Sequence, residues 1–414
     1  MENFLEKMNS FVWGSGLIFI LLFTGTIYTV KLRFIQFRII PFLMKNAKKN
    51  LESNKGMSQW KTVCMSLGTA MGTGNITGVA AAVTLGGAGA IFWMWISALL
   101  GMALVYAENS LSVTYSTKEC RGPMGYLKNG LGSPILAGVF AVMCLAASVG
   151  MGGMIQVSSL MDSVKSTSDV SSIPAAVIIF LMIFIVTSGG AKRIGSAAQA
   201  LLPAASIIYA VMCVWVLICC RSRIPEAFRM IFAQALGYEQ AASGGIGYAI
   251  SIGIRRGIFS NEAGLGSSPV LHSAAESDSP YLQGMWSMFE VFFDTIICCT
   301  LTALVVICSF GDGSASGAFS AVIGDFSEIL LSAVMAVFAF CTIIGWYYCG
   351  ETAWSFLSGR NAGKGFSAFF SAFASLGAVI SLNTIWIISD IFNGLMAFPN
   401  LLGLILLIKK VKKE

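Results

Sequence analysis

The stretch GTAMGTGNITGVAAAVTLGGAGA, residues 68–90, has the apolar character of a membrane helix but is poorly suited to forming one. It contains no charged side chain, and Gly recurs every few positions. A Gly inside a helix costs about 1 kcal/mol relative to Ala, so the four glycines between residues 68 and 78 weaken the helix repeatedly. Thr73, Asn75 and Thr77 add polar groups that lipid cannot satisfy. The stretch therefore predicts a membrane helix that breaks near its middle.

The whole chain has the composition of a helical membrane protein. Of its 414 residues, 56% are hydrophobic and only 11% are charged, and the mean hydropathy is +0.78. Soluble proteins carry about 25% charged residues, so this composition excludes a soluble globular protein. Apolar runs such as 178–186 and 401–408 indicate helices rather than the alternating strands of a β-barrel.

The chain has eleven Cys and a single His. Most of the Cys lie within apolar stretches, where Cys behaves as a small hydrophobic residue. No Cys/His pattern with the spacing of metal ligands occurs in the sequence, so we expect no cofactor and no enzyme activity. We attribute the net charge of +6 to membrane topology and expect no nucleic-acid partner.

A window of about 20 apolar residues divides the chain into eleven membrane spans. We expect these spans at residues 12–30, 62–85, 86–108, 134–161, 173–190, 196–219, 245–274, 285–308, 329–357, 366–382 and 384–408. Residues 1–9 are polar and the first apolar run is long enough to span, so we expect no secretory signal there.

Lys and Arg are distributed unequally between the two sides of these spans. Nineteen of the 26 lie on the side of the 31–61 loop and five on the opposite side, while Arg255 and Arg256 fall within a span. Basic residues gather on the cytoplasmic side of membrane proteins. We therefore expect the N-terminus outside and the C-terminus in the cytoplasm. The short loops favour a prokaryotic plasma (inner) membrane.

Ten spans remain after the first, and they divide into two sets of five. The sets would cover residues 62–219 and 220–408, between an N-terminal segment 1–61 and a basic cytoplasmic tail 409–414. The first span of each set is polar and rich in Gly: GTAMGTGNITG (68–78) and GGIGYAISIGIRRGIFSNEAGLGSSP (244–269). The two spans begin on opposite sides of the membrane. Broken helices at matching positions of inverted halves indicate the binding site of a transporter.

Unwound backbone within a membrane must contact protein, water or a ligand. Its carbonyl groups can bind Na⁺, and the N–H groups at the start of a half-helix suit a carboxylate. An amino acid accompanied by a cation would satisfy both. Close packing of small residues is the alternative explanation for Gly74 and Gly78, but it does not account for Thr73 and Asn75.

The second broken span carries Ser260, Asn261 and Glu262. We expect Ser260 and Asn261 beside the substrate. A carboxyl group within a membrane span is expensive and marks a functional site by default. Two interpretations of Glu262 have equal weight: it lies near the substrate, or it pairs with Arg255 or Arg256 and fixes the bend.

The following span reads MWSMFEVFFDTIICCTLTALVV, residues 285–306. Asp294 and Thr295 lie near its middle, with Glu290 one turn away. Oxygen ligands of this kind suit a hard cation. Alternatively, the Asp294 carboxyl carries a proton or is a structural acid bonded to loosened backbone.

Two further helices and the one His offer polar side chains. Gln156 lies in an otherwise apolar span, and its amide could bind an amino or carboxylate group. Thr342 and Trp346 are four residues apart and share one helix face, where a hydroxyl beside an aromatic wall could bind a small ligand. We expect His272, near the cytoplasmic end of its span, to be a bystander rather than a proton relay.

Four motifs carry a resemblance to a known family. GTGNITGVA (72–80), RGIFSNEAGLGSSP (256–269), FFDTIICCTLT (292–302) and GWYYCGE (345–351) resemble the alanine or glycine:cation symporter family. The likeness covers about residues 12–405. It implies an all-α membrane protein whose inverted five-plus-five core resembles that of the bacterial leucine transporter, plus one extra N-terminal helix. It also implies symport of alanine or glycine with Na⁺, or with H⁺ in some members.

The resemblance assigns roles to residues of this chain. The residues implied to bind substrate are Thr73, Gly74, Asn75, Gln156, Phe259, Ser260, Asn261, Thr342 and Trp346. The residues expected to bind Na⁺ are Gly72, Asn75, Asp294 and Thr295. Met154 departs from the aromatic residue of some relatives, so the size limit of the side-chain pocket stays open.

Three other classes of membrane protein are considered. A channel would need repeated filter sequences or rings of charge, which the sequence does not contain. An intramembrane enzyme would need a nucleophile with a base, or a metal cluster, and one His with scattered acids does not assemble either. A receptor without transport remains as an alternative. The substrate preference between alanine and glycine, its stereochemistry and the coupling ion stay open at this point.

Overall fold

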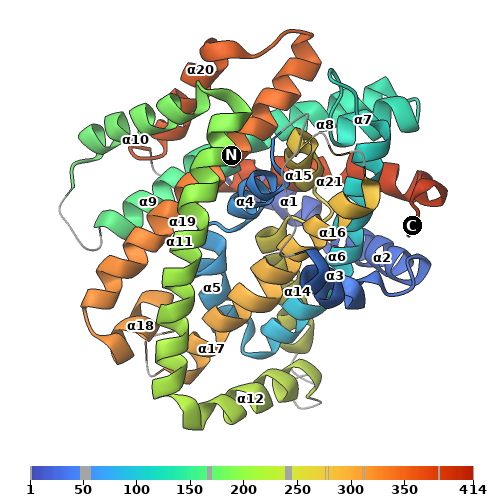
Figure 1. Cartoon of the computed structure of the whole chain (residues 1–414). Helices are drawn as coiled ribbons and strands as arrows, with labels where there is room; N and C mark the ends of the chain where they lie inside the picture. The colour runs from blue at the N-terminus through green and yellow to red at the C-terminus, as the bar shows by residue number, and fades with distance from the viewer. Residues whose placement is uncertain are drawn as a thin grey trace.

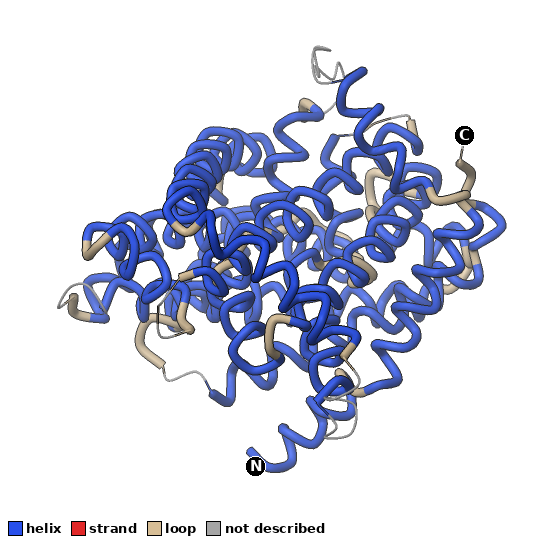
Figure 2. The backbone as a smooth tube through the Cα atoms, turned by 90° about the horizontal axis from the view of Figure 1, so that it is seen from below, coloured by secondary structure: helices blue, strands red, loops and turns tan. Residues whose placement is uncertain are grey.

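The computed structural model describes residues 2–46, 57–165, 170–237, 245–275, 277, 279–309, 311, 313–380 and 383–413. All regular structure within these ranges is helical, and they contain no strand (Figures 1 and 2). The expected all-α architecture is confirmed.

The N-terminal helices pack onto both halves of the core. They comprise α1 (Glu2–Val12), α2 (Ser15–Lys31), η1 (Ile35–Arg38) and α3 (Ile39–Asn46). The helix α2 corresponds to the expected first span and packs against α6 and α21. The Tyr28 hydroxyl donates to the backbone carbonyl of Leu404, 2.8 Å away, which fixes α2 to the end of the chain.

The stretch from α4 to α12 holds the five expected spans of the first set, followed by η5 and α12. It contains α4 (Gln59–Ala70), η2 (Thr73–Asn75), α5 (Thr77–Gly86), α6 (Gly89–Tyr115), α7 (Pro123–Gly125), η3 (Tyr126–Gly130), α8 (Pro134–Ala147), η4 (Ser148–Met154), α9 (Ile155–Lys165), α10 (Ser172–Thr187), α11 (Gly190–Cys219), η5 (Arg221–Arg223) and α12 (Ile224–Leu236). The expected span 62–85 is α4 and α5 with a break between them. The expected span 134–161 is α8, η4 and α9 in continuous succession.

The second half runs from α14 to the C-terminal segment. It contains α14 (Gly245–Asn261), α15 (Ser267–His272), η6 (Ser273–Ala275), α16 (Pro280–Val291), η7 (Phe292–Cys299), α17 (Thr300–Cys308), α18 (Ala315–Ile323), α19 (Phe326–Ser358), α20 (Gly363–Leu376), α21 (Asn383–Leu406) and η8 (Ile408–Lys410). The expected span 245–274 is broken between α14 and α15. The expected span 366–382 is shorter as a helix, because α20 ends at Leu376.

Seven helices in the described ranges are long and apolar enough to cross a membrane. They run from Phe4–Lys31, Gly89–Tyr115, Pro134–Asp162, Gly190–Cys219, Pro280–Cys308, Phe326–Ser358 and Trp386–Leu406. Among the remaining expected spans, two are the broken helices, one is the shorter apolar helix α10, and one is α20.

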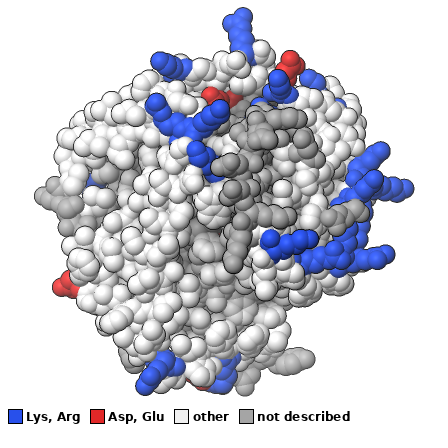
Figure 3. Space-filling view, viewed as in Figure 1, with Lys and Arg blue, Asp and Glu red and all other residues white. Residues whose placement is uncertain are grey.

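The surface has the polarity of a membrane protein. Large apolar side chains are exposed along α10 and α11, including Ile178 and Trp215. Figure 3 shows a broad uncharged face with Lys and Arg gathered mainly along its upper and right-hand margins. Buried Tyr, Phe and Trp residues fill the interior instead, where α4, α14, α16 and α19 surround the two breaks.

Candidate functional site

The first break separates α4 from α5. The helix α4 ends at Ala70, Gly72 is extended, and Thr73–Asn75 form one short turn before α5 begins. The break leaves carbonyl groups that side chains of other helices satisfy. Thr342 of α19 donates to the carbonyl of Gly68 at 3.1 Å, and Thr302 of α17 donates to the carbonyl of Asn75 at 2.9 Å. The expected unwinding at this Gly-rich stretch is confirmed.

The second break separates α14 from α15. Glu262, Gly264 and Gly266 all have positive φ, at 54°, 83° and 88°. An added Cβ on Gly264 would lie 2.3 Å from Leu21, and one on Gly266 would lie 2.8 Å from Phe140. Gly is therefore required at both positions, by backbone conformation and by space.

A buried carboxylate joins the two breaks. Asn75 and Ser260 donate to the two oxygens of Asp294, at 2.5 Å and 2.6 Å. The Thr295 hydroxyl donates to Asp294 at 2.9 Å and accepts from the Asn261 amide at 3.1 Å. All five side chains are buried. This group of Asn75, Ser260, Asn261, Asp294 and Thr295 is called the Asp294 cluster below.

The backbone of η7 explains how two adjacent residues of one helix enter the Asp294 cluster. Residues Phe292–Cys299 form a π-helical segment between α16 and α17. A π-helical turn is wider than an α-helical turn and is found mostly at functional sites. Asp294 and Thr295 project together toward the breaks from this segment.

The Asp294 cluster has the chemistry of a site for a hard cation. It combines a carboxylate with hydroxyl and amide oxygens, the ligands that such cations prefer. The Asn75 amide oxygen is buried and has no hydrogen-bond partner in the part of the chain that the structure describes. A buried acceptor without a donor is costly, and a bound cation would satisfy it.

A second group of polar side chains surrounds Gly72. A Cβ added to Gly72 would lie 3.2 Å from both the Gln156 amide oxygen and the Thr342 hydroxyl. The Thr73 hydroxyl lies 3.5 Å from the same oxygen of Gln156. Gly72, Thr73, Gln156 and Thr342 thus meet at the first break and are called the Gly72 group below.

Trp346 and Phe259 occupy other positions around the breaks. The Trp346 indole donates to Glu262 at 3.1 Å, and an added Cβ on Gly152 would lie 2.2 Å from the Trp346 side chain. The Phe259 ring lies 3.6 Å from the position of a Cβ on Gly74. The structure therefore brings all the expected substrate residues to the two breaks, although the roles assigned to them stay predictions.

The hydrogen-bond partners of Glu262 distinguish between its two interpretations. Ser267 and Trp346 donate to its two oxygens, at 2.5 Å and 3.1 Å. Arg255 lies instead 3.8 Å from Asp390 of α21 and stacks over the ring of Trp13. Glu262 therefore fixes the second break to α19. Its hydrogen-bond partners are Ser267 and Trp346, so the expected alternative of pairing with Arg255 or Arg256 is wrong for the described residues.

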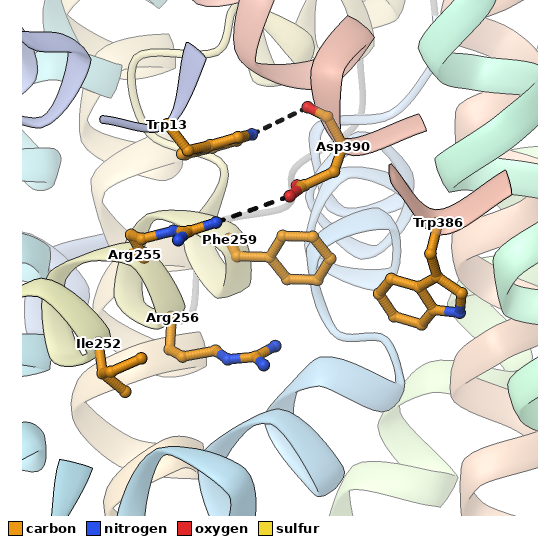
Figure 4. Close-up of a pocket in the computed structure, with 7 residues that line it drawn as sticks. All are labelled: Trp13, Ile252, Arg255, Arg256, Phe259, Trp386 and Asp390. Atoms are coloured by element: carbon orange, nitrogen blue, oxygen red, sulfur yellow. Dashed lines mark hydrogen bonds and ion pairs between the residues drawn. The ribbon is translucent and has the colours of Figure 1, made fainter. Parts of the chain in front are cut away.

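Three structural features near the breaks were not predicted from the sequence. Arg255 and Asp390 line a cavity of about 180 Å³ with Trp13, Phe259 and Trp386, shown in Figure 4. Phe259 lies between the Arg255–Asp390 pair and the Trp386 ring in that view. The other two features are hydrogen-bonded groups around buried Glu108 and Glu290. In the sequence, each of these features is represented only by isolated charged residues within apolar spans.

Glu108 of α6 holds the second break from another side. Its carboxylate accepts from the Asn400 amide. The Asn400 amide also donates to the Gly264 carbonyl at 2.9 Å. These contacts help to hold the second break, where Gly264 and Gly266 have positive φ, in one conformation.

A larger cavity approaches the Gly72 group from the end of the molecule where α12 and α18 lie (Figure 1). Its volume is about 710 Å³, and its walls come from α5, α9, α19 and the segment before α18. Thr77 and Ser159 line it, one helical turn beyond Thr73 and Gln156. The cavity lining therefore ends about one helical turn from the Gly72 group.

Comparison with known proteins identifies the class of protein. The structure of MhsT in complex with L-phenylalanine matches with a TM-score of 0.60 at 12% identity, over 83% of this chain and 89% of that chain. This likeness shows the fold, which is that of the leucine transporter and its inverted repeat.

Two sequence relatives are transporters by name. The sodium/alanine symporter AgcS of Methanococcus maripaludis is 36% identical over 100% of this chain and 96% of its own length. The probable sodium/glutamine symporter GlnT of Bacillus subtilis is 31% identical over 99% of this chain and 89% of its own length.

Fold, broken helices and relatives together define a secondary amino-acid transporter of the membrane, not an enzyme. More particularly, the chain belongs to the sodium:alanine symporter family, whose model matches residues 1–414. The family resemblance of the four motifs is confirmed.

Proposed function

We propose that this protein carries a small neutral amino acid, alanine or glycine, into the cell together with Na⁺. The observation that carries the proposal is the Asp294 cluster, because one carboxylate binds side chains from both breaks. A cation bound there would hold the two half-helices in the arrangement that the substrate requires. Binding of the cation and of the amino acid would then be coupled, as symport demands.

The Gly72 group would bind the polar ends of the amino acid. The start of α5 directs backbone N–H groups and the positive end of the helix dipole toward the break, which suits a carboxylate. The Gln156 amide and the Thr342 hydroxyl lie on the opposite side of Gly72. Phe259 and Trp346 would limit the size of the substrate side chain.

The coupling ion supplies the energy of accumulation. Moving one Na⁺ down a membrane potential of 100 mV releases about 2.3 kcal/mol, and a concentration gradient adds to this. No covalent change of the substrate is required. Movement of the first half (62–219) relative to the second (220–408) would expose the site to each side in turn.

The orientation with the C-terminus in the cytoplasm belongs to the same proposal. The end carrying α12 and α18 would then face outward. The 710 Å³ cavity would be the entry route, and the structure would be closed on the cytoplasmic side.

Uptake of labelled alanine into proteoliposomes tests the proposal. We expect uptake under an inward Na⁺ gradient, competition by glycine, and recovery of chemically unchanged alanine. A matched H⁺ gradient without Na⁺ separates the proton-coupled alternative, in which Asp294 would carry the proton. Excess glutamine as competitor tests whether the pocket accepts a longer side chain. Absence of uptake under both gradients would contradict symport of alanine.

A further inference from the structure

A small enclosed cavity lies beside the second break, on the side away from the 710 Å³ cavity. Its volume is about 10 Å³, enough for one water molecule. Its polar lining consists of Ser66, Asn261, Glu262, Ser268, Ser287 and Glu290. A buried water needs two to four polar partners, and this lining supplies them from α4, α14, α15 and α16.

Glu290 connects this cavity to the one histidine of the chain. Its two carboxylate oxygens accept from the Ser66 hydroxyl and from Nε2 of His272, each at 2.7 Å. The Gln283 amide donates to Nδ1 of His272, which places the ring proton on Nε2. His272 and Glu290 are both buried, at 2% and 5% exposure. A hydrogen-bonded path therefore leads from the cavity through Glu290 to His272.

His272 also forms part of the wall of a third cavity, of about 330 Å³. Ser112, Lys118 and Arg121 line that cavity with it, at the basic end of the molecule. The His272–Glu290 pair thus stands between a water-sized cavity beside the ligand site and a cavity on the proposed cytoplasmic side.

Other ionisable groups surround the pair on the packed helices. They are Cys64 of α4, Tyr106 and Glu108 of α6, Glu262 between α14 and α15, Tyr281 of α16 and Tyr348 of α19, with Lys118 and Arg121 in the wall of the 330 Å³ cavity. Of these, Cys64 and Glu262 lie nearest to Glu290, through electrostatic contact and through the shared cavity.

We propose that His272 and Glu290 form a proton-binding site between the ligand site and the cytoplasm, in addition to the cation site of the transport cycle. The proposal relies on the proposed function for its orientation and for the cycle it regulates. Binding adds one proton to the pair and removes nothing, so the net charge of the pair changes from −1 to 0.

The charge of the pair affects whether the cytoplasmic side stays closed. Ser66 belongs to α4, the half-helix before the first break, and it donates to the same carboxylate as His272. The neutral pair is compatible with a dry interior, whereas a buried net negative charge favours entry of water. Proton binding therefore favours contact of α4, α15 and α16, and proton release favours opening to the cytoplasm.

Nuclear magnetic resonance tests the site directly, because the chain has a single His. Tag-free protein labelled with ¹⁵N-histidine gives the ring signals of His272 alone. We expect these ring signals to change with pH in the unchanged protein, as they must if the pair binds a proton. Their pH dependence should differ in Glu290→Gln, because the carboxylate that contacts Nε2 is then absent. Ring signals that are the same in both proteins would overturn the proposal.

Transport at varied internal pH tests the consequence. Na⁺-driven alanine uptake into proteoliposomes is measured at fixed external pH, with internal pH stepped from 5.5 to 8.5. We expect uptake to slow severalfold at acidic internal pH in the unchanged protein, and this dependence to disappear in His272→Gln and Glu290→Gln. Glu351→Gln, which neutralises a half-buried carboxyl group bonded to Tyr347 on α19, is the matched control and should retain the dependence.

A failure of the proposed function and a failure of the proton-site proposal give different experimental results. If the unchanged protein takes up no alanine, the proposed function fails, while the histidine titration still decides the proton site. If uptake proceeds with the same internal-pH dependence in Glu290→Gln as in the unchanged protein, the proton site is wrong and the symport proposal stands. Should either variant not fold, Ser66→Ala removes one donor to Glu290 and must still alter the histidine titration.

Discussion

At the scale of single residues, polar side chains lie very close to the unwound backbone of the first break. Gly72 lies where any side chain would meet both the Gln156 amide oxygen and the Thr342 hydroxyl. A Cβ at 3.2 Å from each is tight, so one of these groups must move. We infer that position 72 requires Gly because a side chain there would displace the polar groups proposed to bind the substrate.

Gly72→Ala should weaken alanine binding about tenfold, equivalent to about 1.4 kcal/mol, because Gln156 and Thr342 are displaced. Equilibrium binding of labelled alanine in detergent measures this. Gly138→Ala is the matched control, since an added Cβ there meets nothing within 4 Å. Equal binding by Gly72→Ala and the unchanged protein would remove the Gly72 group from the site.

The residue types of the site could be predicted from sequence, but their partners could not. Polar residues within apolar spans were visible, including Asn75, Ser260 and Asp294, and the motifs brought them together. The pairing of His272 with Glu290 joins α15 to α16, and that of Arg255 with Asp390 joins residues far apart in the chain. Such pairings depend on helix rotation and tilt, which local sequence does not specify.

At the scale of helices, both breaks are built into the chain and held by neighbours. Positive φ at Glu262, Gly264 and Gly266 separates α14 from α15, while the Asn400 amide binds the freed carbonyl of Gly264. The first break relies instead on Thr302 and other side-chain donors. The positions of both breaks were predictable from Gly spacing. The π-helical segments η4 and η7 were not, because their sequences do not differ from those of ordinary apolar helices.

Gly266→Ala should destabilise the protein by about 1–3 kcal/mol and abolish uptake, since Ala is strained at positive φ and would clash with Phe140. Thermal unfolding in detergent and alanine uptake are the measurements. Gly247→Ala in α14, where a Cβ meets nothing within 4 Å, should unfold no earlier than the unchanged protein. Normal stability and uptake in Gly266→Ala would show that the second break is not needed.

At the scale of the whole molecule, the fold was predictable because composition, hydropathy and Gly-rich spans agree. Each of the eleven expected spans contains helix, although boundaries moved where polar caps extend a helix beyond its apolar run. The cavities, in contrast, could not be predicted from the sequence. Their shapes follow from the way distant helices pack, and no window along the sequence reports on that.

The proposed orientation predicts which loops a membrane-impermeant maleimide reaches in intact cells. In a background with exposed Cys219 changed to Ser, Ser222→Cys should react before permeabilisation. Lys412→Cys in the basic tail should react only afterwards. The reverse pattern would invert the topology and assign the 710 Å³ cavity to the cytoplasmic side.

The central claim is that the Asp294 cluster couples the cation to the amino acid. The most direct measurement is the affinity for labelled alanine as a function of Na⁺ concentration, in the unchanged protein and in Asp294→Asn. We predict that Na⁺ tightens alanine binding in the unchanged protein, and that this dependence falls by at least about tenfold in Asp294→Asn. Glu351→Gln, which alters a half-buried carboxyl group bonded to Tyr347 on α19, should keep the dependence. An unaltered Na⁺ dependence in folded Asp294→Asn would contradict the account.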